Sequence, residues 1–303
     1  MTTPAAVDEL VDLLTQDGQI QWRGTVLGGG SPYGWADLQG WYDLPEQRGS
    51  NSALPGYHGA FAGRLVSGER VITYDWKSRA DSLAEFGAAM TQLRRITAPD
   101  EDPVEEPLIV RLDGQSLLAW ARCDRRIIPT SRQYAVGRAN GAIQWTATDP
   151  RLYSVQEHVE PVPLATPGTS GLDLSGGGLD FGGGGLDFGG GQQGGVVTAT
   201  NAGHVPTWPT FDVVGPCTGP TITYSGRLLR FDSDFVVLAG QTMTIDTRPG
   251  WRTVEIRGVS VRQHLLVNEW TPLEPEVPTQ IQFTAAAYDA AAQLVVRWRD
   301  AWH

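Results

Sequence analysis

The chain has 303 residues, of which 41% are hydrophobic and 9% aromatic, and a formal net charge of -11. This composition excludes a disordered chain, and no apolar run reaches the roughly 20 residues of a membrane-spanning helix. The negative charge argues against a protein that grips nucleic acid through its phosphates, because that binding needs a basic surface. The N-terminal stretch carries acids and no basic cluster, so we expect neither a signal peptide nor membrane insertion.

Two helices are expected, both in the first half of the chain. The first would begin at Thr3 and Pro4, which suit a cap and a first turn, and would end at Gly18. The second would begin at Ser82, which with Glu85 has the spacing of a capping box. Its apolar face would be formed by Leu83, Phe86, Met90 and Leu93. One apolar face per helix predicts packing against a sheet.

The remainder of the chain has the short, punctuated apolar patterns of β-strands. In the first half we expect strands at residues 19–27, 64–76, 108–112, 116–124 and 142–148. In the second half we expect strands at residues 196–201, 210–214, 221–224, 235–238, 242–246, 253–259, 280–286 and 294–298. Short strands at this regular spacing, without a convincing helix, predict a β-sandwich.

A glycine-rich stretch divides the chain. Gly-Leu-Asp recurs with a period of seven at Leu172, Leu179 and Leu186. Calcium-binding glycine repeats have a different period and glycine position, so turns that pack small apolar side chains are the favoured interpretation. We therefore predict a first domain over residues 1–165, a connector over 166–195 and a second domain over 196–303.

The sequence offers little support for catalysis. No histidine has a second ligand at metal-binding spacing, and no nucleophile, zinc or phosphate-binding motif is present. We predict no catalytic residue, no metal and no cofactor, although a pair of distant carboxylates could still hydrolyse glycosides and exposed aromatic rings could stack on sugars. The only cysteines, Cys123 and Cys217, provide no disulfide framework and suit assembly in a reducing cytoplasm.

Several motifs in the second half resemble the C-terminal region of the distal tail proteins of long-tailed siphoviruses. They are Asn201-Ala-Gly-His204, Pro206-Thr-Trp-Pro209 with the run to Pro216, Gly219-Pro220-Thr-Ile222, and Leu238-Ala-Gly240 followed by Met243-Thr-Ile-Asp246. The ending, with Trp270-Thr-Pro-Leu273 and Val296-Arg-Trp298, is similar to minor tail proteins from phages of actinobacteria. In the first half, Pro55-Gly-Tyr-His58-Gly59 and Thr146-Ala-Thr-Asp149-Pro150 resemble the ring-forming part of the same family. The chain departs from the family pattern at residues 276–279, where a Gly-Asn turn is usual.

The resemblance implies a mainly β protein with an N-terminal ring-forming (belt) domain containing one or two helices, a connector and a C-terminal galectin-like sandwich. It implies a structural virion protein that forms a homohexameric ring at the distal tail tip. That ring would join the tail tube protein to the tail hub, or baseplate, and would leave a channel for the tape measure protein and for DNA, which would pass without specific binding. Assembly would take place in the host cytoplasm.

The candidate contacts of such a ring are aromatic residues of the first domain, two of which, Trp35 and Trp41, we expect to be exposed. The full set is Trp22, Trp35, Trp41, Tyr57 and Trp76. Residues 1–195 contain 24 acids and 15 bases, which would suit a channel that repels phosphates. Three alternatives remain open: a peripheral carbohydrate-binding protein, a tail-associated lysin and a side-fibre adaptor.

Overall fold

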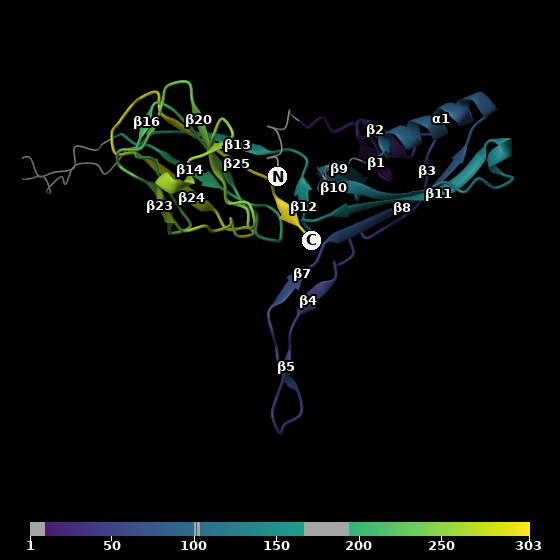
Figure 1. Ribbon diagram of the computed structural model, residues 1–303, viewed down its shortest axis with the longest axis horizontal. Helices are drawn as coiled ribbons and strands as arrows, with labels where there is room; N and C mark the ends of the chain where they lie inside the picture. Colours follow the sequence, from purple (N-terminus) through teal and green to yellow (C-terminus); the bar gives the residue numbers. More distant parts are fainter. Residues whose placement is uncertain (1–9, 100, 102–103, 167–193) are drawn as a thin grey trace, which may run out of the picture. The chain divides into compact units, whose positions relative to one another are not determined.

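The computed structural model describes residues 10–99, 101, 104–166 and 194–303, which form two compact units. The first unit runs to Gln156 and also includes Trp302 and His303, and the second begins at Glu157. Residues 157–165, which the sequence assigned to the first domain, thus belong to the second unit. The Gly-Leu-Asp repeats of the predicted connector lie outside the described residues. The fold is mainly β, as expected (Figure 1).

The first unit is a large antiparallel sheet with one helix against it (Figure 1). Its main strand order is β2-β1-β9-β10-β11-β8-β3, and β12 also pairs with β10. The elements are β1 (Gln19–Trp22), β2 (Thr25–Gly28), β3 (Gly34–Gln39), β4 (Gln47–Gly49), β5 (Ser52–Ala53), β6 (Ala60–Phe61), β7 (Leu65–Ser67), β8 (Arg70–Arg79), α1 (Leu83–Ile96), β9 (Glu106–Leu112), β10 (Gln115–Ile127), the 3-10 turn η1 (Tyr134–Val136), β11 (Arg138–Ala147) and β12 (Leu152–Ser154).

Helix α1 confirms the second predicted helix. The Ser82 side chain accepts a hydrogen bond from the Glu85 backbone N–H at 3.2 Å, which satisfies one of the donors left free at the first turn. Phe86, Met90 and Leu93 are buried in the core of the unit. Leu83, which we also placed on the apolar face, is instead 63% exposed, because it lies in the first turn, at the rim of the core.

The first predicted helix is wrong over its described part, since residues 10–18 contain no helix. Two side chains of β1 take the backbone groups that a helix would use. The Gln19 side chain accepts from the Thr15 N–H at 2.8 Å, and the Gln21 side chain accepts from the Leu13 N–H at 2.8 Å and donates to the Val11 carbonyl at 2.9 Å. These bonds tie the segment to the sheet in a non-helical path.

The strand predicted over residues 19–27 is in fact a hairpin. Trp22 pairs with Thr25, and the turn between them has positive φ at Arg23 (46°) and Gly24 (70°). Two consecutive residues with positive φ define the type I′ turn, whose twist matches that of two antiparallel strands. An arginine at the first position hides this turn from a sequence pattern that looks for Asn-Gly or Asp-Gly.

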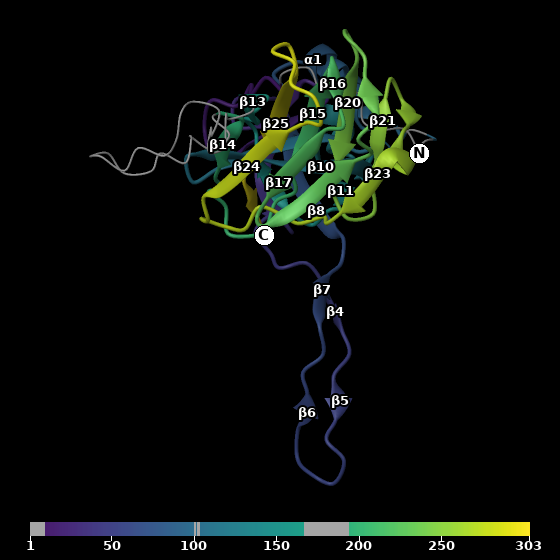
Figure 2. The same cartoon turned by 90° about the vertical axis from the view of Figure 1, so that its left-hand side faces the viewer.

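The second unit confirms the predicted sandwich. One sheet has the order β13-β25-β15-β20-β21-β22, and the other has the order β14-β24-β17-β18-β23. Figure 2 shows these strands from the side. The elements are β13 (His158–Pro163), β14 (Val196–Ala199), β15 (Thr210–Val214), β16 (Cys217–Thr218), β17 (Thr221–Tyr224), β18 (Arg227–Phe231), β19 (Val236–Val237), β20 (Thr242–Asp246), β21 (Val254–Ile256), β22 (Val259–Ser260), the 3-10 turn η2 (Arg262–His264), β23 (Leu265–Asn268), β24 (Thr279–Thr284) and β25 (Gln293–Trp298). The last strand, β26 (Ala301–Trp302), pairs with β12 in the large sheet.

Both sheets of the sandwich contribute to one apolar core. Phe211 of β15 and Tyr224 of β17 meet edge to face with their ring centroids 5.0 Å apart, and both side chains are fully buried. At about 25 cal/mol per Å² of buried apolar surface, each such ring contributes on the order of 2–3 kcal/mol to burial. Alternation of buried and exposed residues along β15 and β25 places one face inward, as the sequence pattern predicted.

Candidate assembly surfaces

The most prominent feature of the first unit is a long β-arm, defined here as residues 40–69. The chain leaves the sheet after β3, passes through two short ladders and returns at the start of β8 (Figure 1). Strand β4 pairs with β7, and β5 pairs with β6 nearer the tip. Figures 1 and 2 both show the β-arm on the side of the sheet away from α1. Only short ladders hold the β-arm together, so it presents most of its surface to the surroundings.

Apolar side chains are exposed along the β-arm. Tyr57 at the tip is 83% exposed, Phe61 is 61% exposed and Leu65 is 65% exposed. Leu44 and Val66 are also exposed. Large apolar residues gathered on one projecting element mark a surface that another protein covers. Tyrosine and phenylalanine are also among the side chains enriched at the centres of such interfaces.

One buried arginine fixes the base of the β-arm. Arg70 is 1% exposed, and its Nη1 donates to the carbonyls of Gly40 (2.8 Å), Trp41 (2.6 Å) and Asp43 (2.9 Å). Its Nε donates to the carbonyl of Pro150 at 2.7 Å. Burial lowers the pKa of this guanidinium, and the charge of Asp43 acts in the opposite direction. A guanidinium suits this place because its planar fork serves several acceptors at once.

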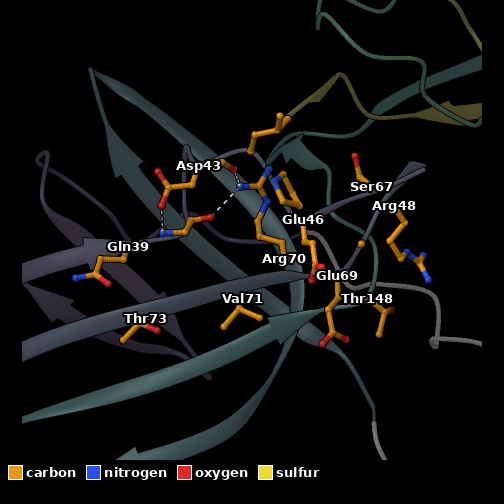
Figure 3. A pocket seen from close by; sticks show the side chains of 14 residues that line it. Gln39, Asp43, Glu46, Arg48, Ser67, Glu69, Arg70, Val71, Thr73 and Thr148 are labelled. Carbon is orange, nitrogen blue, oxygen red and sulfur yellow. Dashed lines mark hydrogen bonds between the residues drawn. The ribbon is translucent and has the colours of Figure 1, made fainter. Parts of the chain in front are cut away.

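A groove of about 740 Å³ lies beside Arg70, where the β-arm meets β3 and β8 (Figure 3). Its walls carry the acids Asp43, Glu46 and Glu69 and the bases Arg48 and Arg70. The lining is therefore polar and of mixed charge. It is not the mainly apolar pocket that small-molecule ligands usually occupy.

Three of the five aromatic residues that we proposed as ring contacts lie in the core of the first unit. Trp22 is fully buried, Trp76 is 1% exposed and Trp41 is 2% exposed, so the exposure expected for Trp41 is wrong. Their side chains pack within their own unit, as Trp22 does on Trp145 with ring centroids 5.8 Å apart. They fill a core of large rings and leave no surface for a neighbour.

The other two aromatic candidates differ. Trp35 of β3 is partly buried and packs on Tyr74, with ring centroids 5.5 Å apart. Tyr57 is the most exposed of the large hydrophobic residues in the part of the chain that the structure describes, and it stays a predicted contact. The sequence singled out Tyr57 but missed Phe61, because no strand pattern was recognised between residues 47 and 61. Leu65 lies within residues 64–76, which we did expect to form a strand.

The two outermost strands of the main sheet path, β2 and β3, each have one unpaired edge within the described residues. Such an edge presents backbone N–H and C=O groups that a strand of another chain can use. The edge of β3 is the longer of the two, at six residues, and it leads directly into the β-arm. The same side of the molecule thus offers backbone donors and acceptors and an apolar projection.

Signs of catalysis or metal binding are few. Among residues 10–99, 101, 104–166 and 194–303, no three acidic, histidine or cysteine side chains gather at a spacing that could hold a metal ion. Cys123 and Cys217 are free thiols, and burial raises their pKa to about 11 and about 12. No helix in the described part of the chain is long and apolar enough to cross a membrane.

Comparison with solved structures shows that the fold of this chain is similar to that of a phage hub protein. The similar structure is that of Dit (gp 19.1) of phage SPP1, which is described as a paradigm of the hub adsorption apparatus in phages that infect Gram-positive bacteria. The TM-score is 0.63 at 13% identity, and the match covers 94% of this chain and 99% of that chain. A structure of the phage P2 baseplate in its activated conformation with calcium matches with a TM-score of 0.49 and 10% identity, over 93% of this chain and 97% of that chain.

No protein-family model matches the chain, and no curated protein does. The likeness to Dit is therefore a likeness of fold, extending over both units. It confirms the Dit-like fold expected from the motifs of both halves of the sequence.

Proposed function

We propose that this protein is a structural component of the virion of an actinobacterial siphovirus. It forms a ring, most simply of six copies, at the distal end of the tail tube. The ring joins the tail tube protein to the tail hub and surrounds the channel through which the tape measure protein and then DNA pass. The protein acts through assembly and has no catalytic role.

The observation that carries this proposal is the match to SPP1 Dit over both units of the chain, with almost no unmatched part in either protein. The free edges of β2 and β3 support ring formation, because the β3 edge of one copy can continue the sheet at the β2 edge of the next. A heterologous contact of this kind closes into a ring when the rotation between neighbouring copies is 360° divided by a whole number.

The faces of the first unit suggest how the ring is oriented. Helix α1 covers one face of the sheet, while the other face of β8 carries Val71, Thr73, Asp75 and Lys77 at exposed or half-buried positions. We assign this second face to the channel, because a polar surface suits a water-filled passage. The β-arm leaves on the same side as this face and would contact an adjacent copy or the next component along the tail axis.

The ring is tested by the mass and shape of the purified full-length protein. A monomer has a mass of 32.8 kDa, and six copies give six times that value, about 197 kDa, in light scattering. Negative-stain images should show rings with a central hole. A protein that remains a monomer at high concentration, alone and with its tube protein, would contradict the proposal.

The β-arm is tested by replacing Tyr57 and Phe61 together with serine. Because both side chains are exposed in the single chain, the double variant should keep its melting temperature and lose mass in light scattering or lose binding to the tube or hub protein. The matched control is Tyr288→Ser in the second unit, which removes an aromatic ring that is 47% exposed. Equal losses for both variants would show that the β-arm has no special role.

A further inference from the structure

The face of the sheet that α1 leaves uncovered has a charge opposite to that of the whole protein. By strand register, alternate residues of β8, β11 and β10 share this face. Those of β8 are Val71, Thr73, Asp75, Lys77 and Arg79. Five basic side chains lie on the face, from Lys77, Arg79, Arg122, Arg125 and Arg138, against the three acids Asp37, Asp75 and Asp124, the last of which is bonded to Arg122. The acid excess of the first domain therefore lies elsewhere, and we name this surface the basic face.

Four of the five bases have no anionic partner among the described residues. Arg122 pairs with Asp124 at 3.1 Å, but no ion pair or side-chain hydrogen bond is found for Lys77, Arg79, Arg125 or Arg138 in the part of the chain that the structure describes. All four are exposed. Their charges are thus available to a ligand, without the cost of breaking an internal ion pair.

Two of these bases also face each other directly. Arg79 and Arg138 are Cα partners across the β8–β11 ladder. Like charges at directly opposed positions destabilise an antiparallel pair. An anion placed between them would remove that repulsion, so this pair is a second observation that points to a negatively charged ligand.

The spacing of the bases suits an extended polyanion. Six residues of β11 separate Arg138 from Gln144, the Cα partner of Arg125, which is roughly 20 Å at about 3.3 Å per residue. Phosphates of one DNA strand advance about 3.4 Å each along the helix axis, so this length matches about six of them. Between the bases lie Asn140, Gln144 and Thr73, which can also hydrogen-bond to phosphate oxygens. Asp75 lies there too, and its carboxylate would repel phosphate and weaken the binding.

We propose that the basic face binds the phosphate backbone of duplex DNA, weakly and without sequence preference. The surface favours a backbone over an acidic peptide, because most of its side chains are polar or charged and only Val71 and Ile127 are exposed large apolar residues among them. The proposal rests on the proposed function, in which passage of the genome brings DNA to this face. Contacts of this kind would slow the sliding of DNA without holding it.

The test measures the fluorescence anisotropy of two labelled 30-base-pair duplexes of unrelated sequence as full-length protein is added. It is repeated at salt concentrations from about 50 to 200 mM, where interactions between charges more than about 10 Å apart are largely screened. Both duplexes should bind equally, and four phosphate contacts give a slope of log K against log salt of about -3.6. The triple variant R79Q/R125Q/R138Q should bind with a slope smaller by about 2.7. It should fold normally, because it also removes the opposed arginine pair.

The matched control is R227Q/R230Q/R257Q, which removes three exposed charges from the second unit and should bind like the wild type. Equal losses in both variants, or no salt-dependent binding by the wild type, would overturn the proposal. Displacement of DNA by polyglutamate at equal charge would assign the face to an acidic protein segment and would also overturn it. Light scattering of the same samples separates this outcome from the proposed function, since the ring can form without DNA binding and DNA can bind without a ring.

Discussion

Replacement of Arg70 by methionine should loosen the β-arm and destabilise the first unit. Methionine keeps much of the apolar stem but removes the donors that serve the carbonyls of Gly40, Trp41, Asp43 and Pro150. A carbonyl left without its donor in a buried place costs on the order of 1 kcal/mol or more. The bond to Trp41 is buried and the other three are partly buried, so the four together give at most roughly 4 kcal/mol. Release of a buried charge, whose pKa is lowered by desolvation, offsets part of this.

We therefore expect a loss of about 2–4 kcal/mol in the free energy of unfolding, which corresponds to a fall in melting temperature of roughly 6–12 °C for a unit of this size. Urea unfolding followed by tryptophan fluorescence measures the first quantity, and scanning calorimetry the second. The exposed control Arg227→Met should change neither by more than about 0.5 kcal/mol.

The same variant reports on the base of the β-arm. Arg48 and Arg64 are exposed β-arm residues after which trypsin cleaves, and cleavage there should become faster once the base is no longer fixed. A variant with wild-type stability and wild-type cleavage at both residues would refute the role assigned to Arg70. Lower stability with unchanged cleavage would show that Arg70 supports the sheet alone.

Two further predictions concern the thiols and the glycines. Burial raises the pKa of Cys123 from 9.0 to about 11 and that of Cys217 to about 12, so at pH 8 their alkylation should be about 100-fold and 1,000-fold slower than in the urea-unfolded chain. The stability that these neutral thiols contribute should be lost as the pH rises from about 9 towards 12. Rapid labelling of the native protein would contradict this. A Cβ on Gly203 would lie 1.9 Å from the Ala301 carbonyl oxygen, so Gly203→Ala should lower the free energy of unfolding in urea by about 1–3 kcal/mol. Gly226 has φ 67° and open space around it, so Gly226→Ala should lower it by only about 1 kcal/mol. The opposite order would refute the clash at Gly203.

The sequence predicted the elements whose signals are local. Ser82 caps α1 with its own hydroxyl, and the alternating residues of β15 and β25 encode which side of each strand is inside. Strands 210–214, 221–224 and 242–246 have the bounds that we expected, because turn residues delimit them on both sides.

The parts that the sequence did not predict depend on contacts between distant residues. Leu13 and Thr15 lie in a stretch whose apolar residues have helical spacing, but the side chains of Gln19 and Gln21 hydrogen-bond to their backbone N–H groups and hold them beside the sheet. Trp41 lies just after β3, at the start of the β-arm, where a pattern predicts an exposed residue, and only the fold shows that it lies in the core. The basic face was hidden for a similar reason, because its five bases come from three strands spread over residues 77–138.

The carbonyls held by Arg70 come from two separate stretches of chain: the start of the β-arm, and Pro150, six residues before the first unit gives way to the second in sequence. Because one guanidinium binds both stretches, a shift of either one strains the hydrogen bonds that Arg70 makes to the other stretch. A force applied at the tip of the β-arm therefore has a direct mechanical route to the segment that leads out of the first unit. A displacement of the β-arm would thus reach that segment without rearrangement of the sheet between them.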